Sequence, residues 1–313
     1  MSPSKNKKLR RVALRLLLFS PLLLLSSCSL QQVPVLHTDG PIAATERDLL
    51  LGAAALMLIV VIPVFVMVAW FAWHYRASNT SARYMPEWGF SAKIEAAVWL
   101  VPTAIVLILG VMVWIYTDQL DPYKTLAIKG DPPLQVEAIS LDWKWLFIYP
   151  KQHIATVNEL VIPTKRPISF KLTSDTVMNS LYIPGLVGQI YTMAGMRTRL
   201  NMLADAPGHF TGLNTQYSGT GFSDQHFAVR AVPTARFSAW IKKVKRTPKR
   251  LDAAAYARLE KPTSDVPVTL YSAVEPDLFS KVIAKYVGPP ARAGHRQQVG
   301  RSQQIADTLR RRG

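Results

Sequence analysis

Two long apolar runs constrain this chain more than any other feature. Residues 49–73 and 96–116 contain no charged side chain, and each is long enough to cross the roughly 30 Å hydrocarbon core of a bilayer as a helix. Pro63 and Pro102 lie inside these runs. Prolines are tolerated in membrane helices when neighbouring groups satisfy the freed carbonyls. The sequence therefore predicts two transmembrane helices joined by a loop over residues 74–95.

Residues 1–27 predict a secretory leader. Six lysines and arginines precede an apolar run over residues 16–25, which is too short to span a bilayer stably. The run ends in Leu25-Ser-Ser-Cys28, which resembles the cleavage box of bacterial lipoproteins, where the cysteine becomes the acylated first residue. Cys28 is the single cysteine of the chain, which excludes an internal disulfide and a site with several thiolates. We therefore expect Cys28 to be lipidated.

The leader and the charges of the loops predict one orientation in a bacterial inner membrane. An exported Cys28 places residues 28–48 in the periplasm and the 74–95 loop in the cytoplasm. The loop carries Arg76, Arg83 and Lys93, whereas the outer segment carries only Arg47, as the positive-inside rule requires. Everything after residue 116 is then expected to be periplasmic.

The net charge of +17 invites a nucleic-acid interpretation, but its distribution argues against one. Residues 242–313 hold sixteen basic and six acidic side chains, and the first 15 residues hold six basic ones. Residues 16–241 are nearly balanced, with fifteen basic and fourteen acidic side chains. The excess therefore lies in the leader and the C-terminal region, and we expect no nucleic-acid partner.

A polar, proline-containing linker over residues 117–133 leads into a segment with the period of β-strands. Apolar residues alternate with others over 168–172, 200–204 and 227–231, between turns rich in Pro and Gly. This pattern predicts a small β-sandwich or barrel over residues 134–232. Four alternating aromatic residues are expected to share one face of a strand and to serve packing: Trp143, Trp145, Phe147 and Tyr149.

Residues 233–287 predict a helical C-terminal region. Thr234 is expected to cap a helix whose apolar face repeats at helical spacing, and residues 251–259 and 276–287 are two further helix candidates. Residues 288–313 are polar, basic and aperiodic, so we expect a disordered tail.

The stretches 175–184 and 214–225 have the spacing of a metal loop without its ligands. They resemble the binuclear copper site in the cupredoxin-like domain of subunit II of respiratory haem–copper oxidases. Thiolates and imidazoles hold copper in that family, whereas amides, a hydroxyl and a phenyl ring cannot. We therefore expect no metal at the five positions that the resemblance assigns to copper ligands: Asn179, Asn214, Ser218, Phe222 and Gln225. A glutamate that offers its backbone carbonyl in the family falls on Gln216.

A cupredoxin frame without copper ligands resembles subunit II of the cytochrome o ubiquinol oxidase type. The resemblance covers roughly residues 25–287 and is closest in 141–150, 155–159, 177–180, 189–196 and 217–219. It implies a complex that oxidises ubiquinol, reduces oxygen to water and pumps protons. It also implies that the haems, the active-site copper and the quinone site belong to subunit I. This chain would then hold no catalytic residue and no cofactor, and its partners would be subunit I, the other oxidase subunits and membrane lipid.

Two alternatives remain open at this point. The chain could be a cytochrome c oxidase subunit II with a degenerate copper site, although residues 134–240 hold nine basic and six acidic side chains, a poor docking face for basic cytochrome c. It could also be a free-standing lipoprotein scaffold or sensor.

Several other residues have two interpretations. Glu95 is either an interfacial acid favoured near a helix N-terminus or a carboxylate at the cytoplasmic mouth of a proton pathway into subunit I. His209 and His226, near the ends of the former metal loop, are expected to be solvated or hydrogen-bonded imidazoles. Four methionines are expected to fill the core rather than bind a soft metal: Met178, Met193, Met196 and Met202.

The leader generates a testable prediction. Cys28→Ala should abolish labelling by a radioactive fatty acid, yet the protein should stay in the membrane fraction, because two spanning helices anchor far more strongly than one acylated cysteine. Labelling of fractionated cells that express either protein provides the measurement. Unchanged labelling, or a soluble exported variant, would contradict this prediction.

Overall fold

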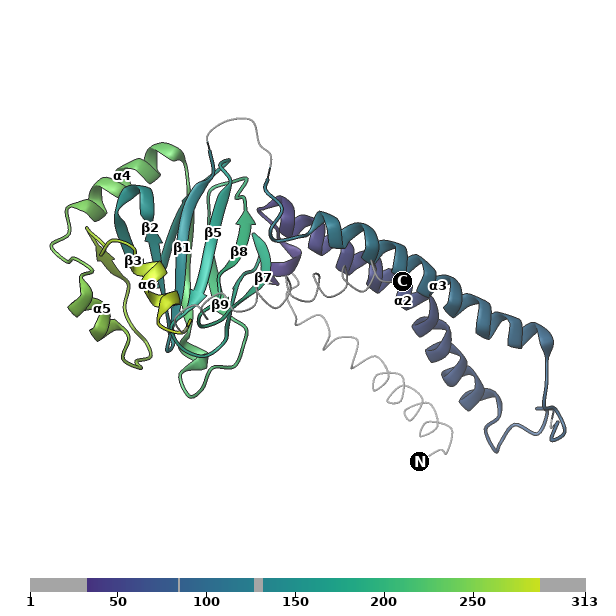
Figure 1. Ribbon diagram of the computed structural model, residues 1–313. Helices are drawn as coiled ribbons and strands as arrows, with labels where there is room; N and C mark the ends of the chain where they lie inside the picture. Colours follow the sequence, from purple (N-terminus) through teal and green to yellow (C-terminus); the bar gives the residue numbers. More distant parts are fainter. Residues whose placement is uncertain (1–32, 84, 127–131, 288–313) are drawn as a thin grey trace, which may run out of the picture.

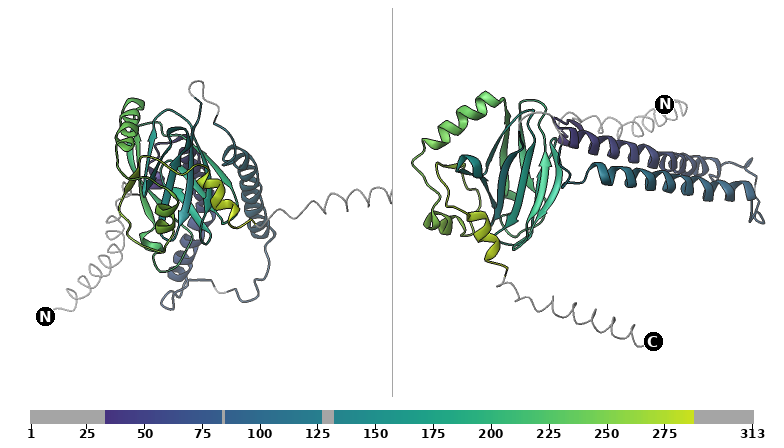
Figure 2. Two further views of the ribbon diagram at one scale, coloured as in Figure 1. Left: turned by 60° about the vertical axis from the view of Figure 1, so that its left-hand side comes forward. Right: turned by 45° about the horizontal axis from the view of Figure 1, so that its top comes forward.

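The computed structural model describes residues 33–83, 85–126 and 132–287. A hairpin of two long helices projects from a β-sandwich, and short helices cover the side of the sandwich away from the hairpin (Figure 1). The second view of Figure 2 shows the same three parts in line. The expected leader, Cys28 and the expected basic tail lie outside the described residues.

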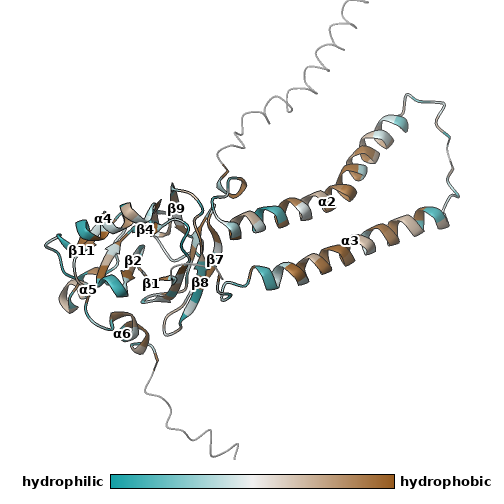
Figure 3. Ribbon diagram, turned by 90° about the horizontal axis from the view of Figure 1, so that it is seen from above, coloured by the Kyte–Doolittle hydropathy of each residue, from teal (hydrophilic) through white to brown (hydrophobic). Residues whose placement is uncertain are grey.

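The two hairpin helices are apolar over most of their length. Helix α2 spans Pro41–His74 and helix α3 spans Ala92–Gln119, with mean hydropathies of 2.9 and 2.5 in their most apolar windows. Only 0% and 6% of those windows are buried inside the molecule, and Figure 3 shows both helices coloured mostly as hydrophobic. Both helices are therefore long and apolar enough to cross a membrane, as the sequence predicts.

Helix α2 starts well before residue 49, and its first turns rest on the sandwich. The backbone N–H of Asp39 donates to the carbonyl of Gly185 at 2.8 Å, and the carbonyl of Asp39 accepts from Asp205 at 2.8 Å. Gly40 approaches so closely that a Cβ there would lie 2.5 Å from the carbonyl oxygen of Leu203. This seam between the helix start and the loops of the sandwich fixes the hairpin to the domain.

The sandwich contains two mixed sheets. One has the strand order β11-β3-β2-β1-β5-β8 and the other β4-β10-β9-β6-β7. The pairs β1–β5 and β4–β10 are parallel, and the remaining pairs are antiparallel. The strands are β1 (Leu134–Leu141), β2 (Lys144–Tyr149), β3 (Ile154–Val157), β4 (Glu159–Pro163), β5 (Ile168–Ser174), β6 (Asn179–Ile183), β7 (Val187–Thr192), β8 (Thr198–Met202), β9 (Gly208–Asn214), β10 (His226–Val232) and β11 (Thr269–Tyr271).

The core between the sheets forms because alternate side chains point inward. Trp145, Phe147 and Tyr149 of β2 are fully buried there, and Phe227 of β10 packs against the first two with ring centroids 5.7 and 4.9 Å apart. Tyr149 also donates its hydroxyl proton to the carbonyl of Val161 at 2.9 Å. The predicted sandwich and the packing role of these three aromatic residues are confirmed.

The strand β2 is buried on both faces. Leu146 and Ile148 point away from the inter-sheet core into a second cluster, together with Ile139 and Leu141 of β1. Three short helices follow the sandwich, and α5 and α6 cover this cluster. Their bounds are α4 (Thr234–Lys245), α5 (Ala253–Leu259) and α6 (Leu278–Ala284). The side chains that close the cluster are Leu251, Ala255, Tyr256, Leu278, Phe279 and Val282.

Some details differ from the sequence-based expectations. The C-terminal region also contains β11, which pairs with β3 and extends the six-stranded sheet. Pro233, not Thr234, is the N-cap of α4, and the expected helix over 276–287 is limited to α6. Trp143 does not share the face of Trp145, because it lies in the turn before β2 with a left-handed φ of 62°. That turn breaks the alternation one residue before the strand begins.

Candidate functional site

The positions that the resemblance assigns to copper meet at one end of the sandwich. This end is formed where β5, β7 and β9 finish and β6, β8 and β10 begin. Asn179 opens β6, Asn214 closes β9, and Ser218 and Gln225 lie in the connection to β10. The structure therefore brings together residues that are far apart in sequence, and we call Asn179, Asn214, Ser218 and Gln225 the amide cluster.

Asn214 lies at the centre of the amide cluster. Its Nδ2 donates to Asn179 Oδ1 at 2.7 Å and to Gln225 Oε1 at 2.8 Å, with Ser218 Oγ at 3.2 Å. Its Oδ1 accepts from the backbone N–H groups of Ser180 and Gln216 at 2.9 and 3.0 Å. One side chain therefore connects every member of the cluster and the backbone on both sides of the loop.

The other three members use their remaining hydrogen-bonding groups. Asn179 Nδ2 donates to the Val177 carbonyl at 3.0 Å, and Gln225 Nε2 donates to the Leu141 carbonyl at 3.3 Å. Ser218 Oγ donates to Gln225 Oε1 at 2.9 Å. Asn179 and Gln225 are 0% and 2% exposed, so these bonds offset the cost of burying polar groups. Hydrogen bonds thus link the buried positions that the resemblance assigns to copper ligands.

Phe222 is not part of the amide cluster. It lies in the short helix η4 (Phe222–Asp224), and its ring packs on Tyr217 with centroids 5.6 Å apart. Gln216 joins the cluster only through its backbone N–H. The aligned position of Phe222 therefore contributes to packing at the surface of the loop.

Trp143 contacts the connection between β9 and β10, in which Ser218 lies. Its Nε1 donates to the Ser218 carbonyl at 3.0 Å. Gly221 leaves room for the ring, because a Cβ there would lie 2.4 Å from Trp143 Cδ2, and Gly219 adopts a φ of +108° that favours glycine. The left-handed turn that removes Trp143 from the strand face thus places it over the loop. Sequence alternation alone could not reveal this role.

The amide cluster offers no metal chemistry of its own. Its polar atoms are neutral and are already hydrogen-bonded to one another, whereas copper in such a site requires thiolate and imidazole. Among the described residues no group of three or more His, Cys, Asp or Glu side chains could hold a metal ion. The side chains of His209 and His226 are exposed. In the register of β9 and β10, His209 lies opposite Arg230 and His226 lies opposite Leu213, so the two histidines are near opposite ends of this strand pair.

The methionine expectation is wrong in part. Met202 is fully buried, but Met178 and Met196 are 40% and 51% exposed. Both lie in loops at the same end of the sandwich as the amide cluster, because each loop joins two strands that meet there. Val177, in the loop of Met178, and Tyr217, in the connection from β9 to β10 at the same end, are 53% and 71% exposed. We call these four exposed apolar residues, Val177, Met178, Met196 and Tyr217, the exposed apolar collar.

A buried carboxylate near the cluster joins the sandwich to the C-terminal region. Asp175 Oδ2 accepts from the Tyr256 hydroxyl at 2.6 Å, and Asp175 Oδ1 accepts from Lys285 Nζ at 2.9 Å. Burial and this hydrogen bond raise the pKa of Tyr256, so the hydroxyl stays protonated. Burial opposes the charge of Lys285, but hydrogen bonds to Glu260 and Asp175 outweigh it and raise the pKa of Lys285.

Lys144 makes a second connection of this kind. Its side chain is fully buried at the start of β2, and Nζ donates to the carbonyls of Asp142 and Lys261 at 2.9 and 3.0 Å and to Thr263 Oγ1 at 2.8 Å. Burial lowers the pKa of Lys144, and Asp142 opposes that shift. No pattern in the sequence marks this lysine, because its acceptors in Lys261 and Thr263 lie more than 110 residues away in the chain.

Glu95 lies in the first turn of α3, where its backbone N–H donates to the Ser91 carbonyl at 2.9 Å. Its side chain is exposed. The first turn of α3 is at the end of the hairpin away from the sandwich (Figure 3). Glu95 therefore lies at the end of the hairpin that is remote from the amide cluster.

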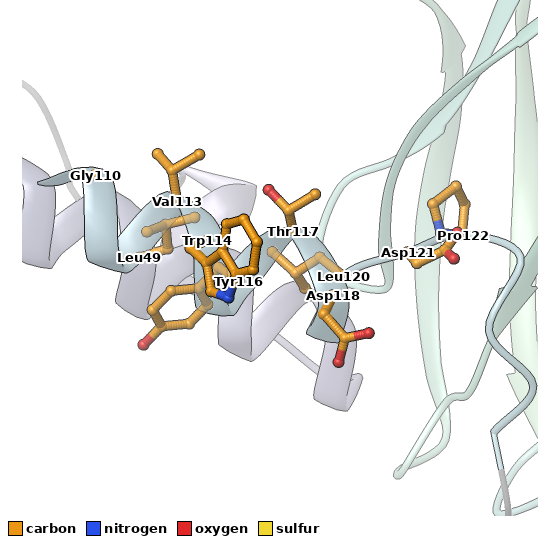
Figure 4. Close-up of a pocket in the computed structure, with 10 residues that line it drawn as sticks. All are labelled: Leu49, Gly110, Val113, Trp114, Tyr116, Thr117, Asp118, Leu120, Asp121 and Pro122. Atoms are coloured by element: carbon orange, nitrogen blue, oxygen red, sulfur yellow. The ribbon is translucent and has the colours of Figure 1, made fainter.

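At the other end of the hairpin, a hollow of about 1030 Å³ lies between α2 and α3. Its lining includes Leu49, Gly110, Trp114, Tyr116 and Asp118, and it reaches the linker that enters the sandwich (Figure 4). Aromatic residues beside a carboxylate at a helix end are typical of the membrane–water interface. The hollow thus marks the level at which the hairpin is expected to leave the bilayer.

Relatives of known name match nearly the whole chain. Ubiquinol oxidase subunit 2 of Acetobacter aceti is 48% identical over 90% of this chain and 91% of its own length. Cytochrome bo(3) ubiquinol oxidase subunit 2 of Pseudomonas aeruginosa is 46% identical over 95% of this chain and 89% of its own. The chain belongs to the ubiquinol oxidase subunit 2 family. This result confirms the family that the copper-free loop indicates in the sequence.

Two further comparisons concern parts of the chain. Residues 245–290 match the family described as the COX Aromatic Rich Motif. In the present chain this range contains α5, β11 and α6. The periplasmic domain of subunit II of the cytochrome oxidase of Bradyrhizobium japonicum is 20% identical, with a TM-score of 0.35 over 37% of this chain and 96% of that one.

The amide cluster generates a prediction about stability. Asn214→Ala should lower the unfolding free energy of the domain by about 2 kcal/mol, because it leaves the buried Asn179 Oδ1 without its donor and the backbone N–H of Ser180 without its side-chain acceptor. Thermal unfolding of the purified protein, followed by tryptophan fluorescence, provides the measurement. Thr220→Ala, at an exposed position of the same loop, is the matched control and should unfold like the wild type. Equal unfolding temperatures for both variants would contradict the role of Asn214.

Proposed function

We propose that this chain is the non-redox subunit II of a proton-pumping haem–copper ubiquinol oxidase. In this proposal, subunit I holds the haems, the copper and the quinone site, and electrons never enter the present chain. The amide cluster is the observation that carries the proposal. A site in which Asn214 satisfies Asn179, Ser218 and Gln225 has neither the ligands nor the open volume for an electron-transfer metal.

The exposed apolar collar supports a docking role for the domain. Val177, Met178, Met196 and Tyr217 are each at least 40% exposed and lie in the loops at the same end of the sandwich as the amide cluster. A contiguous exposed apolar surface in a domain that lies in water indicates an interaction site. We propose that subunit I covers this collar, so that the former metal loop serves to attach the domain.

The hairpin supports a second contact with the rest of the oxidase. Long apolar side chains cover α2 and α3 on all sides, which suits contact with lipid and with other membrane helices. We propose that the sandwich lies in the periplasm, that the 74–95 loop lies in the cytoplasm, and that Cys28 carries a lipid anchor. The charges of that loop and the leader sequence support this orientation.

The donor specificity of the purified oxidase tests the proposal. We expect rapid oxygen consumption with ubiquinol and none above background with reduced cytochrome c, because the domain offers no copper to receive electrons from a soluble protein. The same sample should contain haem and lack the spectrum of a mixed-valence copper pair. Oxidation of cytochrome c together with that spectrum would favour the cytochrome c oxidase alternative, and a chain that purifies without haem proteins would favour the scaffold alternative.

Glu95 is a candidate for proton entry within this proposal. It is exposed at the end of α3 that is expected to face the cytoplasm, where a carboxyl group can take a proton from water and pass it to a neighbouring subunit. Ionisable groups beside the membrane usually face protein or a wet cavity. The alternative role, stabilisation of the helix dipole, is worth only about 0.3–1 kcal/mol at an exposed terminus.

The two roles of Glu95 predict different behaviour of one variant. If Glu95 serves proton entry, the oxidase with Glu95→Ala should assemble with normal haem content but consume oxygen at least several-fold more slowly, and Glu95→Asp should keep more activity. Oxygen consumption per haem with excess ubiquinol, together with the ratio of haem to protein, measures this. Glu87→Ala in the adjacent loop is a matched loss of one exposed carboxylate. If the oxidase with Glu95→Ala consumed oxygen at the wild-type rate, the proton-entry role would be contradicted and Glu95 would be an interfacial acid only.

A further inference from the structure

A basic hollow lies in the C-terminal region, away from the amide cluster. It encloses about 510 Å³ between the segment that follows α4, the helix α5 and the strand β11. Lys249 and Arg250 come from the first of these and Arg258 from α5. In Figure 1, α5 lies on the side of the sandwich opposite the helix hairpin. The hollow therefore stays open to water when the hairpin spans a membrane.

The three cations of the hollow have no carboxylate partner among the described residues. All three side chains are exposed, and none takes part in an ion pair there. The two nearest acids along the chain are engaged elsewhere: Asp252 accepts from the N–H of Ala255 at the start of α5, and Glu260 binds Lys285. The hollow thus carries positive charge that the domain itself does not neutralise.

The other residues that line the hollow supply apolar side chains and the hydroxyl group of Tyr271. Leu259, Val266 and Tyr271 are half-buried along it. Burial raises the pKa of Tyr271, and Arg258 opposes that shift, so the phenol lies within the field of this guanidinium and stays protonated as a hydrogen-bond donor. Thr263 at the rim is held in place by Lys144, whose Nζ donates to its Oγ1 at 2.8 Å. A buried lysine therefore fixes one wall of the hollow.

We propose that this hollow binds a soluble oligoanion, a small molecule with two or more adjacent phosphate or carboxylate groups. Two guanidinium groups and one ammonium group match such a ligand, because arginine forms paired charge-assisted hydrogen bonds with phosphate and carboxylate oxygens. The volume is in the usual range of small-molecule sites, about 300–1,000 Å³. This binding site is additional to the oxidase function and independent of it.

Anions could also bind this region through its general positive charge, without a defined site. The lysines of α4 allow the two explanations to be separated. Lys242, Lys243 and Lys245 are exposed on this helix and also lack an ion pair in the described part of the chain. They do not line the hollow. If charge alone attracts anions, the loss of three cations from α4 should weaken binding as much as the loss of three cations from the hollow.

The test uses the whole purified oxidase complex in a phosphate-free buffer and inorganic pyrophosphate as the probe. Isothermal titration calorimetry compares the wild type with two variants of equal charge change. The hollow variant carries Lys249→Gln, Arg250→Gln and Arg258→Gln, and the control variant carries Lys242→Gln, Lys243→Gln and Lys245→Gln. Ubiquinol oxidation and the unfolding temperature, which should match the wild type in both, establish that the variants are folded and assembled.

We expect saturable binding of pyrophosphate to the wild type. The hollow variant should lose at least about tenfold in affinity, because paired contacts to the anion are removed, and the control variant should lose no more than about threefold, because only long-range attraction is weakened. The absence of saturable binding to the wild type, or equal losses in the two variants, would overturn the proposal. Either result would leave the oxidase assignment untouched, since that assignment rests on donor specificity.

Discussion

The rest of the structure depends on one constraint, which is that the strand β2 and the second half of β1 are buried on both faces. Trp145 and Phe147 need the second sheet to cover them, and Leu146 and Ile148 need a separate layer on the outside. The C-terminal region supplies that layer through α5 and α6. Burying a large apolar side chain is worth about 1.5–3 kcal/mol, so neither cover can be removed without exposing several such groups.

The layers are aligned by a few polar contacts that cross between them. Asp175 binds Tyr256 and Lys285, and Lys144 binds the backbone of Lys261. Apolar packing is not directional, whereas a buried charge requires particular partners at particular positions. These contacts therefore fix how the C-terminal region sits on the sheet. One of them also shapes the basic hollow, because Lys144 binds Thr263 at its rim.

Sequence patterns predicted what depends on local periodicity and missed what depends on distant contacts. The two apolar runs, the strands with period two and the empty metal loop could all be recognised in the sequence. The short strand β11 could not, because three residues carry no period and are held by pairing with β3. The turn at Trp143 was missed as well, since its left-handed backbone is stabilised by Ser218 and Gly221, which are more than seventy residues away. The amide cluster explains why the loop keeps its shape without metal, which the substitutions alone do not.

The amide cluster takes the place that the resemblance assigns to a metal. Asn214, Ser218 and Gln225 are joined to one another by hydrogen bonds, at positions where the resemblance implies bonds to a copper pair. Amides are suited to replace it, because each carries both donors and acceptors and can satisfy its neighbours without a net charge. The hydrogen bonds then hold the loop in place, and the exposed apolar collar beside it is available for contact. In the proposed function, such a subunit keeps its sandwich while electrons come from a membrane-bound donor and do not pass through it.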